Sequence, residues 1–245
     1  MKSNERLPSD QRPKLLDELE KRYSIKSTWR SKLFFFWKKT AWVTIVEASK
    51  ITKRIVDIVG SITLMVFFSP LFLIIPFAIK LYDGGPVIYA RPRIGKWGEE
   101  FLFPKFRTMR VDADRLKKSL KSMHTNQKTF KLRNDPRVTP LGIFLRKSSL
   151  DELPQLWCVL KGEMSLVGPR PPLPEEVSTY TIKDRKRLNI TPGLTGIWQV
   201  SGRSELPFEK QLELDDQYIQ SQSIWGDLII LAKTIPAVLF GRGAY

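Results

Sequence analysis

The longest apolar run in the chain is IVGSITLMVFFSPLFLIIPFAI, which covers residues 58–79 and carries no charged side chain. A helix needs roughly 20 such residues to cross the core of a bilayer, so length alone predicts a spanning helix. However, Ser69-Pro70 lies in the middle, and a proline there removes a helical hydrogen bond and bends or breaks the helix. Basic residues flank both ends, and positive segments prefer the cytoplasmic side of a membrane. We therefore favour a re-entrant helix, broken at Ser69-Pro70, over a spanning helix.

Two shorter amphipathic segments lie outside this run. Residues 32–50, KLFFFWKKTAWVTIVEASK, combine aromatic rings with lysines, a composition typical of the membrane interface. An amphipathic helix packed on the protein explains the same pattern, and both alternatives stay open. Residues 224–240 carry Asp227 and Lys233 within an apolar pattern, which predicts an amphipathic helix lying on a membrane or on the protein core.

The region after residue 80 mixes short elements. Alternating apolar and polar positions predict strands at 85–90 and 100–106. The charged stretch 110–123 predicts a helix, and 133–142 is rich in turn-forming residues. The expected fold class is therefore α+β and mainly helical, in a monotopic membrane protein with amphipathic helices at the membrane interface.

Composition narrows the chemistry. The formal net charge of +16 calls for anionic partners, which include nucleic acid, an acidic membrane surface and phosphorylated substrates. The single histidine, His124, argues against a zinc site and against a Ser-His-Asp triad. The single cysteine, Cys158, excludes an internal disulfide. If a metal is bound, carboxylate oxygens are its expected ligands, and such a site suits magnesium.

The stretch RKSSLDELPQLWCVLKG, residues 146–162, places two adjacent acids in a basic chain, with apolar residues at helical spacing behind them. Ser149 and Glu152 fit a capping box, which would make the acids structural. Alternatively, Asp151 is itself the N-cap and Pro154 falls in the first turn, where a missing N–H costs little. The helix dipole would then favour the ionised carboxylate that a nucleophile needs. Taken alone, the pattern favours the structural cap.

Basic residues spread over several loops could converge on a diphosphate, because arginine binds phosphate oxygens in pairs. For any one of them, a solvated surface position is the simpler interpretation. Prolines on both sides restrict Arg170, and Gly193 and Gly196 permit close backbone approach. The candidate phosphate-binding or substrate-binding residues are Arg146, Lys105, Arg107, Arg93, Arg170 and Arg203.

Several ordered motifs resemble a known family. KFRTM (105–109), SLDELPQLWCVLKGEMSLVGPRP (149–171), TPGLTGIWQVSGR (191–203) and the ending GRGAY are similar to the bacterial sugar transferases, which are monotopic polyprenyl-phosphate phosphoglycosyl transferases. The resemblance runs from about Lys53 to Tyr245. It implies transfer of a hexose-1-phosphate from a UDP-sugar to undecaprenyl phosphate with release of UMP. This is the first membrane step of exopolysaccharide, capsule or O-antigen assembly.

The resemblance also implies roles for single residues. Asp151 and Glu152 match the family's catalytic pair, which works with Mg²⁺ and is expected to hold it. Asp151 is expected to attack the phosphate next to the sugar and form a covalent phosphosugar-aspartyl intermediate, while Glu152 serves proton transfer or supports the metal. Arg146, five residues before Asp151, matches a phosphate contact. Ser69-Pro70 matches the family's helix-breaking pair.

The expected organisation has three parts: a partly interfacial N-terminal extension (1–50), a re-entrant membrane helix (51–82) and a cytoplasmic catalytic domain (83–245). The expected place is the cytoplasmic face of the bacterial inner membrane. The expected partners are a UDP-hexose, undecaprenyl phosphate and the cytoplasmic leaflet, but not nucleic acid, and the assembly considered is a homodimer. GIWQVSGR and the ending GRGAY favour glucose or galactose. The family often has glutamine where this chain has Arg91, which leaves the role of that residue open.

The alternative from another class is a membrane-tethered basic protein that binds lipid or nucleic acid. It explains the net charge of +16 and the apolar run. It leaves the adjacent acids and the GPRPP and PGLTG segments unexplained. The transferase is therefore the preferred hypothesis.

Overall fold

The computed structural model describes residues 29–113, 115–116 and 135–239 of the chain. The first 28 residues, most of the charged helix predicted at 110–123, His124 and the ending GRGAY lie outside the described residues. The chain divides into two compact units, Met1–Ile51 and Thr52–Tyr245.

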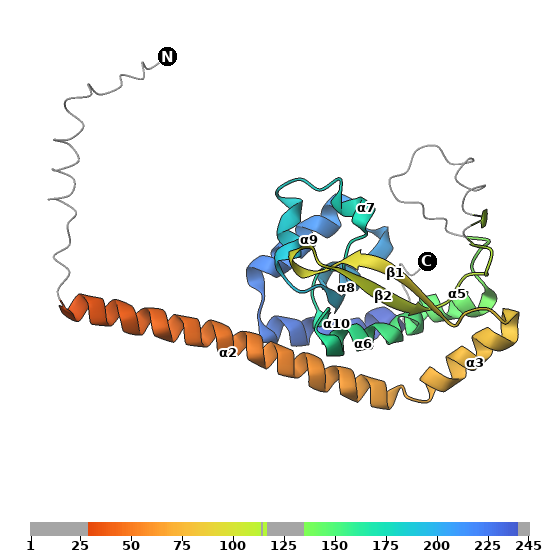
Figure 1. The fold of residues 1–245 in the computed structure, drawn as a ribbon, viewed down its shortest axis with the longest axis horizontal. Coiled ribbons are helices and arrows are strands. Elements are labelled where there is room, and N and C mark those ends of the chain that lie inside the picture. The colour runs from red at the N-terminus through yellow and green to blue at the C-terminus, as the bar shows by residue number, and fades with distance from the viewer. Residues whose placement is uncertain (1–28, 114, 117–134, 240–245) are drawn as a thin grey trace, which may run out of the picture. The chain divides into compact units, whose positions relative to one another are not determined.

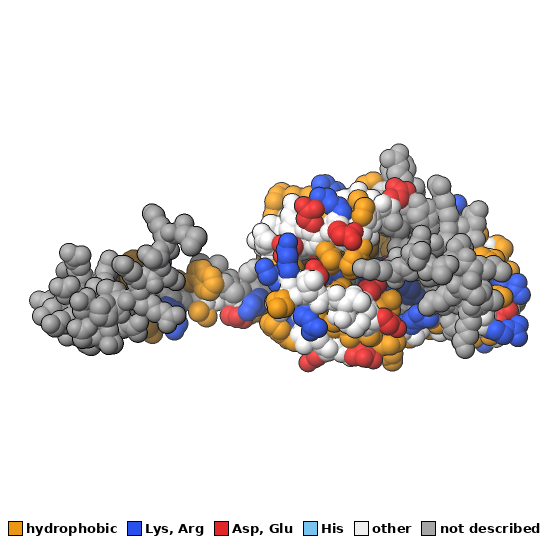
Figure 2. Space-filling model, turned by 90° about the horizontal axis from the view of Figure 1, so that it is seen from above, with side chains coloured by type: hydrophobic (Ala, Val, Ile, Leu, Met, Phe, Trp, Pro, Cys, Tyr) orange, Lys and Arg blue, Asp and Glu red, His pale blue; other side chains and the backbone are white. Residues whose placement is uncertain are grey.

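Helices dominate the described residues, and their strands form two sheets of two strands each (Figure 1). The predicted α+β, mainly helical fold class is therefore confirmed. Within the unit from Thr52 onward, α3, α6 and α10 lie along one side, α7 and α9 lie on the opposite side, and the β1–β2 hairpin runs between them (Figure 1). Figure 2 looks onto the side of α7 and α9, where acidic, basic and apolar side chains are interspersed.

Helix α2 (Trp29–Phe67) is 39 residues long and continues without interruption through the predicted boundary at residue 50. It ends in a turn, and α3 (Leu71–Asp83) follows directly. Pro70 cannot donate a backbone hydrogen bond, and short turn bonds replace the helical ones: Ser69 N–H donates to Val66 O at 3.2 Å. The expected helix break at Ser69-Pro70 is therefore present.

The bent pair of helices is the part of the chain whose length and composition suit a membrane. Among the described residues, no single helix is both long and apolar enough to cross one. Lys32–Phe67 and Leu71–Asp83, bent by 58° at the break, reach that length and composition only together, as a broken span or a re-entrant loop would.

Strands β1 (Ile88–Ile94) and β2 (Glu100–Phe106) form an antiparallel hairpin around the short η1 turn (Lys96–Gly98). The prediction for β2 is confirmed, but the strand predicted at 85–90 was placed too early. The observed strand passes through Pro92, which is tolerated because a two-stranded sheet consists of edge strands only. Residues that face each other in the register share one face of the hairpin, and on that face they are Tyr89, Arg91 and Arg93 with Lys105, Phe103 and Phe101.

The segment after the hairpin builds the core. Helix α5 (Pro140–Lys147) starts at the N-cap Thr139, whose hydroxyl accepts a hydrogen bond from Gly142 N–H. The 3₁₀ turn η2 (Leu150–Gln155) and helix α6 (Leu156–Lys161) follow and bury their apolar residues. The elements after α6 are β3 (Ser165–Val167), α7 (Pro174–Val177), η3 (Asp184–Asn189), β4 (Gly193–Thr195), α8 (Ile197–Ser201), η4 (Arg203–Glu205), α9 (Phe208–Ser221) and α10 (Ile224–Leu239). Helix α10 confirms the helix predicted at 224–240.

The parallel pair β3–β4 was not predicted from the sequence. It places Gly193 so close to Gly168 that a Cβ at position 193 would lie 2.0 Å from the Gly168 nitrogen. The close approach expected at Gly193 is thus an approach of backbone to backbone. Each strand has only three residues, too few for the alternation by which strands are recognised.

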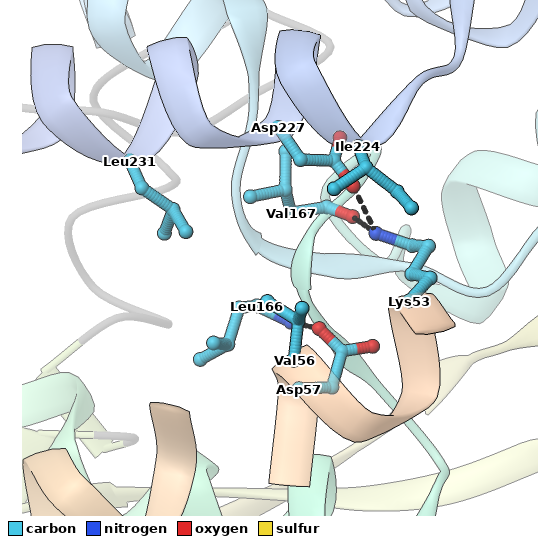
Figure 3. Close-up of a pocket in the computed structure, with 8 residues that line it drawn as sticks. All are labelled: Lys53, Val56, Asp57, Leu166, Val167, Ile224, Asp227 and Leu231. Atoms are coloured by element: carbon cyan, nitrogen blue, oxygen red, sulfur yellow. Dashed lines mark hydrogen bonds and ion pairs between the residues drawn. The ribbon is translucent and has the colours of Figure 1, made fainter. Parts of the chain in front are cut away.

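Residues near the start of the second unit tie α2 to the core (Figure 3). Lys53 Nζ donates to Asp227 Oδ2 of α10 at 2.5 Å and to Val167 O at 3.1 Å. Asp57 Oδ1 accepts hydrogen bonds from Ser165 Oγ and Leu166 N–H, each at 2.9 Å. These buried bonds join α2, β3 and α10 into one body, because breaking any of them would leave a buried charge or amide unpaired.

Candidate active site

The two acids lie in a 3₁₀ turn and not at the start of an α-helix. Ser149 adopts a left-handed conformation (φ 55°), and its side chain caps nothing. Its carbonyl accepts the N–H of Glu152 at 3.1 Å, and the α-helix begins only at Leu156. Both predicted caps, the Ser149–Glu152 capping box and the Asp151 N-cap, are therefore wrong. Pro154 inside the pattern explains the difference, since a 3₁₀ turn ahead of α6 accommodates it without loss of an α-helical bond.

Asp151 is buried and Glu152 is partly buried, and both lie beside two cations. Their side chains are 8% and 21% exposed. Lys105 Nζ, on β2, lies 2.6 Å from Glu152 Oε1 and 3.5 Å from Asp151 Oδ2. Arg170 Nη2, from the loop after β3, donates to Glu152 Oε1 at 3.1 Å. Three separate elements thus meet at one pair of carboxylates, and sequence reasoning had selected all four residues.

The surroundings shift the pKa values of the two carboxyl groups in opposite directions. Burial raises the pKa of Asp151 above its ordinary range, although the nearby charge of Lys105 opposes the shift. Burial would also raise the pKa of Glu152, but the charges of Arg170 and Lys105 hold it below its ordinary value. The expectation that a helix dipole keeps Asp151 ionised is therefore replaced: the neighbouring cations, and not a helix end, oppose its protonation.

Two further predicted arginines act on the pair at longer range. Arg146 donates through Nε to Thr108 Oγ1 at 2.9 Å, and its positive charge lowers the pKa of Asp151. Burial lowers the pKa of Arg203, and the charge of Glu152 acts in the opposite direction. Arg203 itself has a positive φ of 53° in η4. The structure therefore gathers both residues around the acids without a direct ion pair in the contacts described.

Arg93 also belongs to this cluster. Its Nη1 donates to Pro171 O at 3.0 Å, and its guanidinium lies over the ring of Phe103. Burial and the charge of Arg170 lower the pKa of Arg93 to about 10. The residue therefore lies next to the segment that carries Arg170.

Arg107 is held elsewhere. Both of its terminal nitrogens donate to the carboxylate of Asp83, and Nε donates to Pro86 O at 2.5 Å. These bonds connect the end of α3 to the end of β2, so Arg107 makes a structural contact here, and its phosphate contact stays a prediction. Arg91 contacts the hydroxyl and ring of Tyr89 on its own strand.

Sequence reasoning missed Arg187 and Asp215, which help to fix the segment of Arg170. The carbonyls of Arg170, Pro171 and Pro172 each accept a hydrogen bond, from Arg187 Nη2, Arg93 Nη1 and Ile94 N–H, all at 3.0 Å. Arg187 is itself buried, and Asp215 of α9 lies 2.6 Å away. Arg187 and Asp215 belong to no recognised motif and are 28 positions apart in the sequence, so no local pattern connects them.

The carboxylate pair fits a divalent cation whose shell is completed by a substrate. Within the described ranges, no group of three or more His, Cys, Asp and Glu side chains could hold a metal. Lys105 Nζ nevertheless shows that one cation can lie between Asp151 and Glu152. Magnesium commonly uses one or two carboxylates together with phosphate oxygens and water. The donor set present here suits such a site.

Comparison with known proteins gives a consistent result. Residues 48–241 match the bacterial sugar transferase family. The chain is 47% identical over 199 residues to the galactosyl transferase CpsE of Streptococcus agalactiae. It is 42% identical over 217 residues to the exopolysaccharide production protein ExoY of Rhizobium meliloti. It is also 42% identical over 204 residues to the undecaprenyl-phosphate galactose phosphotransferase of Salmonella typhimurium.

The coverage differs among these relatives. The aligned part takes in 79% of this chain but 43% of CpsE, and 81% of this chain but 43% of the Salmonella protein. For ExoY it takes in 86% of this chain and 95% of the relative. The chain therefore spans less than half the length of CpsE and of the Salmonella protein, and nearly all of ExoY.

The buried Arg187–Asp215 pair predicts a measurable stability cycle. Arg187→Met leaves Asp215 buried without a counter-charge, which costs about 3–5 kcal/mol and lowers the Tm by roughly 6–20 °C. The double variant Arg187→Met/Asp215→Leu removes that unpaired charge, so it should recover the part of the loss that the charge causes, but not the part that comes from the lost bonds to Arg170 O and Tyr180. Thermal melting of the purified full chain in detergent measures both.

The exposed Lys210–Glu213 pair provides a control, because its side chains are 50% and 68% exposed. Lys210→Met should leave the Tm within about 1–2 °C of the wild type. A double variant at 187 and 215 that is no more stable than Arg187→Met would contradict the assignment of a buried ion pair.

Proposed function

The chain belongs to the bacterial sugar transferase family, and on that premise we propose that it transfers a hexose-1-phosphate from a UDP-hexose to undecaprenyl phosphate and releases UMP. The observation that carries the proposal is the pair Asp151–Glu152 in η2, of which Asp151 is buried and Glu152 partly buried, contacted by Lys105 and Arg170. A nucleophilic carboxylate and a set of cations that accept a diphosphate are what this reaction requires. The names of the Salmonella and CpsE relatives support galactose as the hexose.

In the first half-reaction, an Asp151 carboxylate oxygen attacks the phosphorus next to the sugar. The bond from that phosphorus to the oxygen bridging to the uridine phosphate breaks, and UMP departs with the bonding electrons. Asp151 then carries the hexosyl phosphate as an acyl phosphate. Two like charges approach in this step, and Lys105, Arg170 and Arg146 lie where they reduce that repulsion.

In the second half-reaction, a phosphate oxygen of the undecaprenyl carrier attacks the same phosphorus, and the bond to Asp151 breaks. The product is the lipid-linked diphosphate sugar, and the Asp151 carboxylate is regenerated. Glu152 stays ionised, because Arg170 and Lys105 hold its pKa low. Its role is therefore to hold these two cations in place and to help bind a metal, and not to donate a proton.

Magnesium is the cofactor proposed for this site. Asp151 and Glu152 would hold it together with diphosphate oxygens, consistent with their joint contact with Lys105. When bound, the ion would screen the charge of the diphosphate. Lys105, Arg146 and Arg170 bind and orient the same phosphates.

The apolar side of the second unit supports a membrane location. Helix α3 exposes Leu73 (76%), Phe77 (66%) and Leu81 (72%), and α10 exposes Trp225 (73%) and Ile235 (63%). These helices lie along one side of the unit (Figure 1). Monomeric soluble proteins rarely expose so many large apolar side chains together. We therefore place this side in the cytoplasmic leaflet of the bacterial inner membrane, with α2 and α3 as a re-entrant helix pair.

One prediction of the proposed function concerns turnover. Asp151→Asn removes the nucleophile and should lower UMP release by about 10³-fold or more. Glu152→Gln releases Lys105 and Arg170 and should lower it by about 10²-fold. The assay combines the full chain with Mg²⁺, undecaprenyl phosphate and a panel of UDP-sugars that includes UDP-galactose and UDP-glucose. Glu213→Gln, an exposed carboxylate on α9, is the control with an unchanged rate. Wild-type turnover in Asp151→Asn would refute the nucleophile.

The second prediction concerns topology. Single cysteines replace Ser49 and Tyr82, which are both exposed and lie before and after the break, in a chain whose buried Cys158 is changed to Ala. In sealed vesicles of known orientation, a membrane-impermeant thiol reagent should label both positions from the cytoplasmic side. Labelling of the two cysteines from opposite sides would establish a spanning segment instead.

A further inference from the structure

Three cations of the candidate site share one aromatic ring. Phe103 on β2 is 3% exposed. The Cζ atoms of Arg93 and Arg170 lie 5.3 and 5.5 Å from the centre of its ring, and Lys105 Nζ lies 5.7 Å from it. All three fall within the roughly 6 Å at which a cation is attracted to an aromatic ring.

The fold brings these cations to Phe103 from separate places. Lys105 follows Phe103 by two positions on the same strand and therefore shares its face of the hairpin. Arg93 comes from the same face of β1, where it pairs with Phe101, next but one to Phe103. Arg170 comes from the loop after β3. The carbonyls of this loop accept hydrogen bonds from Arg187, Arg93 and Ile94. The arrangement is therefore a product of tertiary packing.

These cations repel one another. They carry three positive charges close together, near the negative charges of Asp151 and Glu152 and within reach of the charge of Glu176, and burial removes part of the screening by water. The lowered pKa of Arg93, caused by burial and by Arg170, reflects that repulsion. A nearby group that attracts cations would reduce this repulsion and keep the three side chains in the site.

The chain solves the same problem differently at Arg107. There, the carboxylate of Asp83 binds the guanidinium directly and occupies its donors. A third carboxylate among Arg93, Lys105 and Arg170 would likewise compete with a phosphate for them. An aromatic face attracts cations through its quadrupole but accepts no strong hydrogen bond, so the N–H donors stay available.

We propose that Phe103 is a positioning residue whose ring gathers Arg93, Lys105 and Arg170 without occupying any N–H group, so that the donors not bonded to Asp151, Glu152 or Pro171 O face the diphosphate of the donor substrate. This inference rests on the proposed function for the identity of the ligand. It adds a residue that makes no hydrogen bond with its side chain and touches the substrate only through the cations it holds.

The test replaces Phe103 with phenylalanines that carry one, two and three ring fluorines. Fluorine withdraws the negative charge from the ring face while changing its size little, so the fold is preserved. The Kd for UDP and the KM for the UDP-sugar should rise stepwise, to about tenfold for the trifluoro ring, which corresponds to about 1.4 kcal/mol. The Tm should stay constant across the series.

Phe106 provides a matched control on the same strand. It is also 3% exposed, and its ring packs edge to face with that of Phe72, with 5.9 Å between the ring centres. The same fluorine series at Phe106 should leave the Kd for UDP unchanged. If Phe103 served packing only, its fluorine series would behave like that of Phe106. Any effect would then appear in the Tm, and the Kd for UDP would show no stepwise dependence on fluorine number.

The two readouts separate this inference from the proposed function. UMP release without any trend in Kd or KM along the Phe103 series would overturn the positioning role of Phe103 and leave the proposed transferase function intact. A stepwise trend in the Kd for UDP without UMP release from any UDP-sugar would support the positioning role of Phe103 and overturn the proposed transferase function. Absence of both UDP binding and UMP release would overturn both.

Discussion

The compensation of two adjacent carboxylates, one buried and one partly buried, is the constraint on which the rest of the structure depends. A charge that is taken out of water costs several kcal/mol unless opposite charges and hydrogen bonds offset it. Asp151 and Glu152 obtain that compensation from Lys105 on β2 and Arg170 in the loop after β3. Because these cations belong to different elements, the site exists only when β2, η2 and that loop are packed together.

The surrounding contacts follow from this requirement. Arg187, held near Asp215, fixes the backbone of Arg170, and prolines on both sides leave that segment little freedom. Lys53 and Asp57 fasten α2 to β3 and α10, so the helix pair with the length and composition of a membrane segment is anchored to the body that carries the acids. In the proposed function, a lipid-linked acceptor and a water-soluble donor meet at this site.

The sequence predicts the elements with strong local signals and misses those that depend on tertiary contacts. Helix α10, strand β2 and the break at Ser69-Pro70 are confirmed, because apolar periodicity and proline act locally. Pro154 converts the predicted cap into a 3₁₀ turn. Arg107 was selected for its charge, but its partner Asp83 lies 24 positions away and no pattern links them. The same limit hid the parallel pair β3–β4 and the clamp of Arg187 on Arg170. The convergence of the basic loops that carry Lys105 and Arg170 was expected from the affinity of basic side chains for phosphate, and the catalytic role of the two acids from motif resemblance; the spacing of the residues predicted neither.

The central claim is that Asp151 becomes covalently bonded to the hexosyl phosphate, and mass spectrometry of the enzyme tests it most directly. The full chain is mixed with a UDP-hexose and Mg²⁺ without undecaprenyl phosphate, quenched rapidly and digested. We expect the peptide that contains Asp151 to gain the mass of one hexosyl phosphate, with an equal amount of UMP released, and to lose that mass when undecaprenyl phosphate is added. A peptide that stays unmodified, together with UMP release that begins only when the acceptor is present, would contradict the account and indicate direct transfer between the two substrates.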